Sequence, residues 1–308
     1  MRKIFAIGET VLDIVFRDSQ PIAAKAGGSM LNTAVSLGRL RLPIHFISEY
    51  GADTVGTIID KFLAENGVDT TFIYHYTEGK SALALAFLDE KSNASYDFYK
   101  IYPEKRLDIN FPSMNKDDLV LFGSFFALTS EIREPMMNFI NDAKANDAVI
   151  VYDPNFRKSH LKELDALRPV ILENMSNASI VRCSDEDMEY IFHVQDPDSA
   201  YEKIQPFCSN MLYTSSSKAV YLRTPEISLT FPVKKINPVS TIGAGDNFNA
   251  GIMYGLFKHG IGNYEISNLS EEDWFRLLQY GVDFASEVCI SYDNYISEVF
   301  ALNLIDKQ

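Results

Sequence analysis

Gly243-Ala244-Gly245-Asp246, the start of the run GAGDNFNAG at residues 243–251, stands directly before an apolar segment with helical spacing. Its glycines allow the backbone to approach an anion closely, and the free amides at a helix N-terminus bind phosphate. A carboxylate beside that phosphate, such as that of Asp246, can accept the proton of an attacking hydroxyl. The run therefore predicts an anion-binding turn that begins a helix and serves phosphoryl transfer. The alternative is a tight turn in which Asp246 only caps the helix.

Single residues exclude two other phosphate-binding motifs. The dinucleotide-binding fingerprint requires a third glycine three residues after the second, and Phe248 stands there. Gly79-Lys80-Ser81 has the ending of a P-loop, but Tyr74 replaces the glycine that this motif requires earlier. The anion site at residues 243–251 is therefore expected to be of a different kind.

The composition narrows the class of protein. The chain has 308 residues, 46% of them hydrophobic, which is enough for a sizeable core. Its net charge of -14 argues against nucleic acid as a partner, because no basic stripe is present to meet backbone phosphates. No apolar stretch is long enough to span a bilayer or to act as a signal peptide. Cys183, Cys208 and Cys289 are widely spaced and odd in number, so no disulfide framework is expected, and the reducing cytoplasm is the expected location.

Short buried runs alternate with amphipathic stretches along the chain. The runs typical of buried strands are residues 4–7, 44–48, 119–122, 149–152, 180–181 and 211–213. The stretches with helical spacing include residues 32–40, 54–66, 134–145, 185–192, 273–280 and 282–291. This alternation predicts an α/β fold with a mostly parallel central sheet and helices on both faces. Because ligands bind at the carboxyl ends of the strands in such sheets, the motifs are expected to meet in one crevice there.

Residues 9–26 and 72–105 interrupt this rhythm. The first segment alternates loosely between apolar and polar residues, and the second contains strand-like runs at 82–88 and 96–102 around a turn at 89–93. They predict a small antiparallel lid inserted in a single domain of residues 1–308, since no linker divides the chain. Closure of such a lid excludes water from a reaction. The alternative is an edge hairpin without that role.

A second set of glycine and polar residues lies near the N-terminus. Gly27 and Gly28 allow a ligand to lie against the backbone, and Asn32 offers both donors and acceptors to hydroxyl groups. Asp13 follows the first predicted strand and, when ionised, only accepts hydrogen bonds, so it suits one or two sugar hydroxyls. The alternatives are an ordinary glycine turn and a solvated loop acid.

Taken together, these segments resemble those of the PfkB (ribokinase-like) family of carbohydrate kinases. The resemblance extends over nearly the whole chain, and the motif at 243–246 is its most specific part. The segments that carry it are residues 7–9 with Asp13, 27–32, 51–56, 65–70, 153–157, 184–187 and 243–246. The fold that the resemblance implies is a ribokinase-like three-layer sandwich with a mostly parallel central sheet and a small β lid.

The resemblance implies roles for particular residues. Asp246 corresponds to the family's catalytic base, which deprotonates a sugar hydroxyl. The anion hole that stabilises the transferring phosphoryl group corresponds to Gly243, Ala244 and Gly245. The positions that hold the sugar correspond to Asp13, Gly27, Gly28 and Asn32.

Further sugar contacts are implied by two segments. Residues 153–157, Asp-Pro-Asn-Phe-Arg, resemble the version found in fructokinases and in kinases of 2-keto-3-deoxy sugar acids. Asn155 and Arg157 are therefore expected beside the sugar, and the planar fork of an arginine suits a phosphate or a carboxylate. Tyr96 and Phe98 resemble lid residues that cover the sugar in fructokinase-like members. The alternatives are an Asx-Pro turn whose arginine pairs with a surface acid, and aromatic residues that only pack the lid.

The resemblance also implies a nucleotide side, with ATP and Mg²⁺ as cofactors. Asp187 stands where the family has the glutamate of an Asn-x-x-Glu motif that acts on Mg²⁺ through water, and Ser184 replaces the asparagine. Thr214 and Ser216 lie in the segment that borders the nucleotide, where related proteins carry glycines. Ser240-Thr241-Ile242 lacks the Asp-Thr pair that helps to hold a monovalent cation in similar kinases.

The sequence thus predicts an ATP-dependent kinase that phosphorylates a primary hydroxyl of fructose or a related keto sugar. The alternatives are a kinase of a 2-keto-3-deoxy sugar acid or of a nucleoside and, from another class, a non-catalytic sugar or nucleotide sensor that kept the fold. The expected partner is a small-molecule sugar, with no nucleic acid and no membrane. Because related kinases often pair through the lid, a homodimer is a further expectation.

Overall fold

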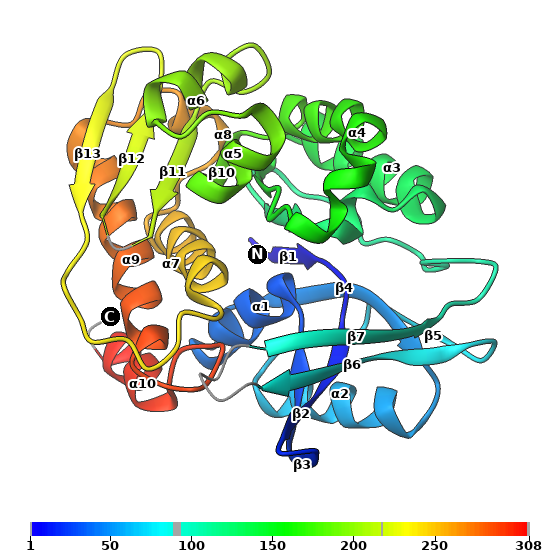
Figure 1. The fold of residues 1–308 in the computed structure, drawn as a ribbon. Helices are drawn as coiled ribbons and strands as arrows, with labels where there is room; N and C mark the ends of the chain where they lie inside the picture. Colours follow the sequence, from blue (N-terminus) through cyan, green and yellow to red (C-terminus); the bar gives the residue numbers. More distant parts are fainter. Residues whose placement is uncertain (1, 89–93, 217, 307–308) are drawn as a thin grey trace.

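The computed structural model describes residues 2–88, 94–216 and 218–306, and its centre is a nine-stranded sheet in the order β13-β12-β11-β10-β9-β8-β1-β4-β5 (Figure 1). The strands are β1 Ile4–Ile7, β4 Ile44–Gly51, β5 Ile73–Tyr76, β8 Leu119–Gly123, β9 Val149–Asp153, β10 Ile180–Ser184, β11 Met211–Ser215, β12 Ala219–Arg223 and β13 Ser228–Pro232. All neighbours from β5 to β11 pair in parallel, and β12 and β13 add antiparallel strands at one edge. The prediction of a mostly parallel sheet is confirmed.

Helices cover both faces of this sheet. One face carries α1 Ser29–Arg39, α2 Thr54–Glu65, α7 Ala244–Lys258, the single turn α8 Asn263–Ile266, α9 Glu271–Cys289 and α10 Glu298–Ile305. The other face carries α3 Arg133–Ala145, α4 Leu164–Ser176, α5 Asp185–Phe192 and α6 Pro197–Ile204. Side chains of a strand alternate between the two cores, so that Ile4 and Ala6 of β1 belong to one and Phe5 and Ile7 to the other.

The run at 243–251 forms the first half of α7, and its last glycine serves packing. A Cβ on Gly251 would lie 2.3 Å from the carbonyl oxygen of Tyr280 in α9. In return, a Cβ on Gly281 of α9 would lie 2.6 Å from the ring of Phe248. The two helices therefore pack with their backbones close together, which fixes the position of α7 against the sheet.

A four-stranded lid lies beside the main sheet, in the order β3-β2-β6-β7 (Figure 1). Its strands are β2 Val11–Arg17, β3 Gln20–Gly27, β6 Lys80–Leu88 and β7 Ala94–Ile101. The hairpins β2–β3 and β6–β7 are antiparallel as predicted, whereas β2 and β6 pair in parallel. This follows from the topology, because β2 and β6 both leave the carboxyl edge of the main sheet, after the parallel strands β1 and β5.

Three local predictions need correction or lie outside the described residues. Residues 73–76, expected in the lid, form β5 of the main sheet because Ile73 and Tyr76 are buried there. The stretches 273–280 and 282–291 form one helix, α9, which ends at Cys289, two residues before the end of the second stretch. The expected turn at 89–93 lies outside the described ranges. Within those ranges, no helix combines the length and the apolar character needed to cross a bilayer.

Candidate active site

The predicted anion-binding turn lies at the N-terminus of α7. Gly243 caps the helix with a φ of 79°, in the left-handed region, and a Cβ there would lie 2.8 Å from the carbonyl oxygen of Asn294. The helix begins at Ala244. The amides of Gly245 and Asp246 have no acceptor among the residues that the structure describes. Two backbone donors at the positive end of a helix are therefore available to an anion.

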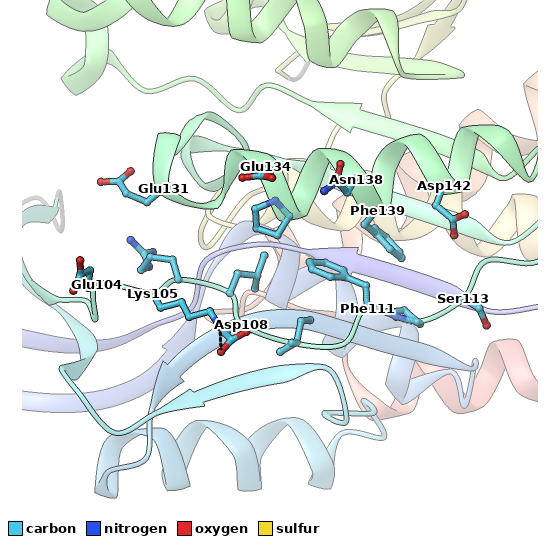
Figure 2. Close-up of a pocket in the computed structure, with 15 residues that line it drawn as sticks. Glu104, Lys105, Asp108, Phe111, Ser113, Glu131, Glu134, Asn138, Phe139 and Asp142 are labelled. Atoms are coloured by element: carbon cyan, nitrogen blue, oxygen red, sulfur yellow. Dashed lines mark ion pairs between the residues drawn. The ribbon is translucent and has the colours of Figure 1, made fainter.

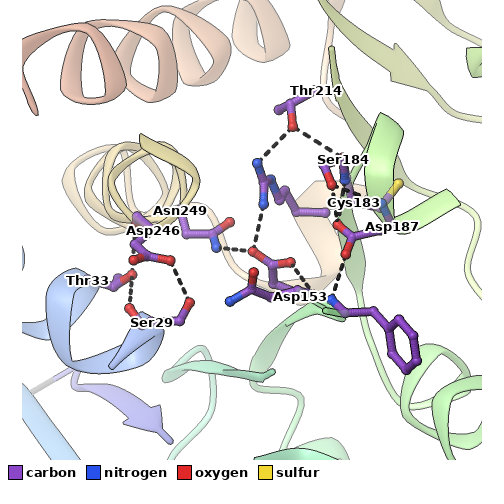
Figure 3. Close-up of polar contacts among 12 residues, drawn as sticks. Ser29, Thr33, Asp153, Cys183, Ser184, Asp187, Thr214, Asp246 and Asn249 are labelled. Atoms are coloured by element: carbon purple, nitrogen blue, oxygen red, sulfur yellow. Dashed lines mark hydrogen bonds and ion pairs between the residues drawn. The ribbon is translucent and has the colours of Figure 1, made fainter. Parts of the chain in front are cut away.

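Helix α1 holds the carboxylate of Asp246 (Figure 3). Ser29 Oγ donates to its Oδ1 at 2.5 Å, and Asn32 Nδ2 donates to its Oδ2 at 2.8 Å. Thr33 Oγ1 donates to the carbonyl of Asp246 at 2.7 Å. Burial raises the pKa of Asp246 above its usual range, while the bonds from Asn32 and Ser29 and the nearby charge of Arg157 act in the opposite direction. The result is a positioned carboxylate with increased proton affinity, as a general base needs.

Asp13 lies on β2 against the glycines of the neighbouring strand β3. A Cβ on Gly27 would lie 2.2 Å from Asp13 Oδ2, so only glycine leaves room for this carboxylate. Gly28 has a φ of 141°, and a Cβ there would lie 2.3 Å from the carbonyl oxygen of Glu9. Burial raises the pKa of Asp13 from 3.8 to about 6. The two glycines therefore place a desolvated carboxylate beside the N-terminus of α1.

Arg157 and Tyr96 lie near these carboxylates. The charge of Arg157 acts on Asp246, and the charges of both Asp13 and Arg157 act on the hydroxyl of Tyr96, whose pKa is raised by burial. Tyr96 stacks on Phe98 in β7 with ring centroids 5.9 Å apart, and Phe98 is 58% exposed. The structure thus brings Asp13, Tyr96 and Arg157 to one place beside Asp246, with the exposed ring of Phe98 next to Tyr96.

Asp153, at the end of β9, is the centre of a buried polar cluster (Figure 3). Its Oδ2 accepts hydrogen bonds from Arg182 Nη1 at 2.9 Å and from Asn249 Nδ2 at 2.6 Å. Its Oδ1 accepts the backbone amide of Asn155 at 3.1 Å, and Asn155 has a positive φ of 40°. Arg182 Nη2 donates to Thr214 Oγ1 at 2.7 Å. The cluster joins β9, β10 and β11 to α7.

The guanidinium of Arg182 lies directly behind the anion-binding turn. A Cβ on Gly245 would be 3.0 Å from both of its terminal nitrogens. Its Nε is buried and has no hydrogen-bond partner in the described part of the chain. No sequence motif pointed to a role for Arg182. The available signal was a lone charged residue inside the buried strand β10, IVRCS.

Asp187 closes a capping box at the start of α5. Its Oδ2 accepts from the amide of Ser184 at 2.8 Å and from the hydroxyl of Ser184 at 2.7 Å, and its Oδ1 accepts the amide of Phe156 at 2.7 Å. Burial and the charge of Asp153 raise the pKa of Asp187. Both oxygens therefore have protein partners, and the contact with Mg²⁺ through water that the sequence implied stays a prediction.

Thr214 and Ser216 are the two residues that were expected to border the nucleotide. The hydroxyl of Thr214 is already bonded to Arg182. Ser216 is exposed, follows β11 and has a φ of 41°, a left-handed conformation that glycine adopts without strain. This accounts for the glycines that similar kinases carry near this point. Contacts of the two side chains with a nucleotide stay predictions.

A cavity of about 680 Å³ lies elsewhere, between residues 104–113 and helix α3 (Figure 2). Its lining includes Arg106, Phe111, Glu134, Phe139 and Asp142. None of the residues predicted to bind sugar or nucleotide lines it. The polar groups suited to chemistry lie instead at the carboxyl ends of the parallel strands, as expected for an α/β sheet.

Comparison with curated proteins finds carbohydrate kinases. A fructokinase of Rhizobium leguminosarum bv. trifolii is 28% identical over 261 residues, which cover 82% of this chain and 79% of that protein. A putative sugar kinase of Pyrococcus horikoshii is 26% identical over 268 residues, which cover 83% of each.

Comparison with solved structures shows the fold. A double-mutant fructokinase from Vibrio cholerae O395, in a form with fructose, ADP and potassium ion bound, has a TM-score of 0.84 at 18% identity, covering 99% of this chain and 98% of that one. Aminoimidazole riboside kinase from Salmonella enterica, complexed with aminoimidazole riboside and an ATP analog, has a TM-score of 0.82 at 19% identity, covering 99% of each. Because kinases of different substrates share this fold, the fold does not select the sugar.

The family is decided by the match over the chain as a whole. The model of the pfkB family carbohydrate kinases matches residues 1–297. That range contains both the anion-binding turn of α7 and the lid. The chain therefore belongs to the pfkB family of carbohydrate kinases.

Proposed function

We propose that this protein transfers the terminal phosphoryl group of ATP to a primary hydroxyl of fructose or a related keto sugar. The observation that carries the proposal is the position of Asp246, whose carboxylate belongs to the same helical turn as two unpaired amides and lies within reach of the charge of Arg157. Relatives named fructokinase, at 28% and 26% identity, support fructose as the sugar. A structural neighbour described with fructose and ADP bound supports it further.

The sugar binds between the lid and α1. Asp13 accepts hydrogen bonds from sugar hydroxyls. Oδ1 of Asn32 is buried and has no partner among the described residues, so it accepts another. Arg157 donates from the opposite side, and the stacked rings of Tyr96 and Phe98 cover the less polar face of the sugar. The binding groups thus come from both hairpins of the lid and from the main domain.

Asp246 orients the primary hydroxyl and takes its proton as the phosphoryl group arrives. The new bond joins the sugar oxygen to phosphorus while the bond between phosphorus and ADP breaks. The amides of Gly245 and Asp246 and the positive end of α7 stabilise the charge on the transferring oxygens. The buried charge of Arg182 behind Gly245 adds to the positive potential at this point.

ATP would lie along the strand ends on the side of β10 and β11, and Mg²⁺ bound with its phosphates would neutralise part of their charge. Within the described ranges, no group of three or more histidine, cysteine or acidic side chains is placed to hold a metal. This fits an ion whose ligands are largely phosphate oxygens and water. Asp187 would contact this ion through water, since both its oxygens already accept protein hydrogen bonds.

We also propose that the working form is a cytoplasmic homodimer joined through the lids. β7 is an edge strand whose backbone can pair with another strand, and its Tyr99 and Ile101 are 58% and 61% exposed. The cysteines Cys183, Cys208 and Cys289 are free and buried, which suits a reducing compartment.

The test is ATP consumption over a panel of fructose, other keto sugars, a 2-keto-3-deoxy sugar acid and a nucleoside. We expect turnover with fructose and, in Asp246→Asn, a fall in kcat of about 10³-fold with sugar binding retained. Asp283→Asn, an exposed acid on α9, is the matched control and should keep its activity. Near-full activity of Asp246→Asn removes Asp246 from the role of base. Turnover of the sugar acid or the nucleoside in place of fructose reassigns the substrate, and sugar binding without any turnover indicates a sensor.

A further inference from the structure

The hydroxyl of Ser29 donates a hydrogen bond to Asp246, the proposed base, and no sequence motif indicated this contact. Ser29 is the first residue of α1, and its Oγ lies 2.5 Å from Asp246 Oδ1 (Figure 3). The other oxygen, Oδ2, has its own donor, Asn32 Nδ2, at 2.8 Å. Each oxygen of the carboxylate thus receives one hydrogen bond from the first turn of α1. Two donors on one rigid helix fix the plane of the carboxylate relative to the sugar subsite.

The backbone fixes the position of Ser29. Gly28 before it has a φ of 141°, a conformation that side-chain-bearing residues rarely adopt. Thr33 Oγ1 lies 3.4 Å from the carbonyl of Ser29 and 2.7 Å from the carbonyl of Asp246. Helix α1 and the first turn of α7 are therefore held in one register. If the Ser29 hydroxyl is removed, Oδ1 of Asp246 loses its hydrogen-bond donor, and a shift of α1 cannot supply another because the helix is held in place.

The charges around Asp246 come from several elements. Arg157, after β9, favours the ionised carboxylate, and Asp153 at the end of β9 disfavours it. Arg182 of β10 lies behind Gly245, and the N-terminus of α7 adds its positive dipole end. Against these long-range effects, the bonds from Ser29 and Asn32 are the direct contacts that the carboxylate makes with protein donors.

We propose that Ser29 is a positioning residue of the phosphoryl transfer, whose hydroxyl holds the Asp246 carboxylate in the orientation that receives the sugar proton and favours its ionised form before the sugar arrives. In the transfer the proton moves from the sugar hydroxyl to Asp246. Ser29 donates its hydrogen bond throughout and gives up no proton. The inference rests on the assignment of Asp246 as the base.

The experiment measures kcat and kcat/KM for fructose against pH at saturating MgATP. Loss of a hydrogen bond to the partly buried carboxylate raises its proton affinity, so we expect the acidic limb of the pH profile of Ser29→Ala to move up by about one pH unit. We expect kcat on the plateau to fall about tenfold, because the carboxylate is no longer held in one plane. KM for ATP should not change. The ionisation of ATP itself is common to all variants and does not affect the comparison.

Ser29→Thr and Ser36→Ala are the controls. Ser29→Thr keeps the hydroxyl and should keep the acidic limb near that of the wild type. Ser36→Ala removes another hydroxyl from the same helix, one that donates to Asn247 Oδ1 at 2.5 Å and not to the Asp246 carboxylate, so it should lower the unfolding temperature without moving the limb. If Ser29→Ala does not fold, Ser29→Cys offers a weaker donor and should give an intermediate shift.

The outcomes separate this inference from the assignment of the base. An inactive Asp246→Asn together with a Ser29→Ala variant that keeps the wild-type limb and plateau overturns the role of Ser29 alone. An active Asp246→Asn overturns both. A shift of the limb in Ser36→Ala equal to that in Ser29→Ala also overturns the proposal, because the effect would then come from helix stability.

Discussion

Asp13 and Asp246 both lose water on folding, but their partners differ. Asp246 accepts hydrogen bonds from Ser29 and Asn32 on its two oxygens. Asp13 has no such donor among the described residues, and burial alone raises its pKa from 3.8 to about 6. Between pH 3.8 and about pH 6, Asp13 in the folded protein therefore holds its proton more tightly than Asp13 in the unfolded chain does. The contribution of Asp13 to stability therefore declines as the pH rises through this window.

This raised pKa predicts a pH dependence of sugar binding. An ionised Asp13 accepts hydrogen bonds from sugar hydroxyls more strongly than a protonated one. We expect KM for fructose to fall as the pH rises, with a midpoint at or below about 6, since bound sugar favours the ionised form. Asp13→Asn should raise KM about tenfold or more and remove this pH dependence. Steady-state KM values across the range decide the point, and an unchanged pH profile in Asp13→Asn would contradict it.

At the scale of elements, the sequence predicts well where a pattern is local. The segments 4–7 and 185–192 are observed as β1 and α5 with the same bounds, because each combines a clear period with clear end signals. β5 and the antiparallel pair β12 and β13 were not recognised as part of the main sheet. The position of these strands in the main sheet depends on strands that are distant in the sequence, as β5 depends on its pairing with β4. The sequence predicted two helical stretches separated at Gly281, but α9 continues through this residue. The glycine is there because a Cβ would collide with the ring of Phe248.

In the candidate site, too, local patterns could be predicted from the sequence and long-range contacts could not. The glycines and the acid at residues 243–246 are recognisable because the chemistry of an anion-binding turn requires them next to one another. The bond between Ser29 and Asp246 joins residues that are 217 positions apart, and that between Asn249 and Asp153 spans 96. Such contacts depend on how α1, α7 and β9 pack, and no local pattern contains that information.

The ends of the lid are joined by a polar contact that we expect to govern closure. Glu9, before β2, accepts hydrogen bonds from Lys100 Nζ at 2.6 Å and from the hydroxyl of Tyr102, near the end of β7. In Glu9→Gln we expect KM for fructose to rise by up to about fivefold, the factor that ~1 kcal/mol gives. A looser lid also admits water, so the ratio of ADP released to sugar phosphate formed should increase.

The measurement is a coupled assay of both products, with the unfolding temperature as a control. The partly exposed pair Glu9–Lys100 contributes little to global stability, so the unfolding temperature should hardly change. Lys100→Met should reproduce the effects of Glu9→Gln. A rise in KM with no change in the product ratio would show that the contact affects sugar binding only.

At the scale of the whole molecule, the exposed edge of the lid predicts association. We expect sedimentation to show a dimer for the wild type and a monomer for Ile101→Glu, because a charge on β7 opposes the pairing of two lids. Tyr264→Glu, on α8, changes a side chain that is 76% exposed outside the lid and should leave the dimer intact. A monomeric wild type at micromolar concentration would exclude the proposed assembly.

The buried cysteines give the protein an internal measure of its own opening. Cys183 lies on β10 between Arg182 and Ser184, and burial raises the pKa of its thiol. Only the thiolate reacts, so a thiol reagent reaches this sulfur when the strands around it separate. The rate of labelling of Cys183 in the native protein therefore reports how often the wall behind the anion-binding turn, formed by β9, β10 and β11, opens. Comparing that rate with and without nucleotide measures, with no introduced probe, how far ligand binding slows the local unfolding of this wall.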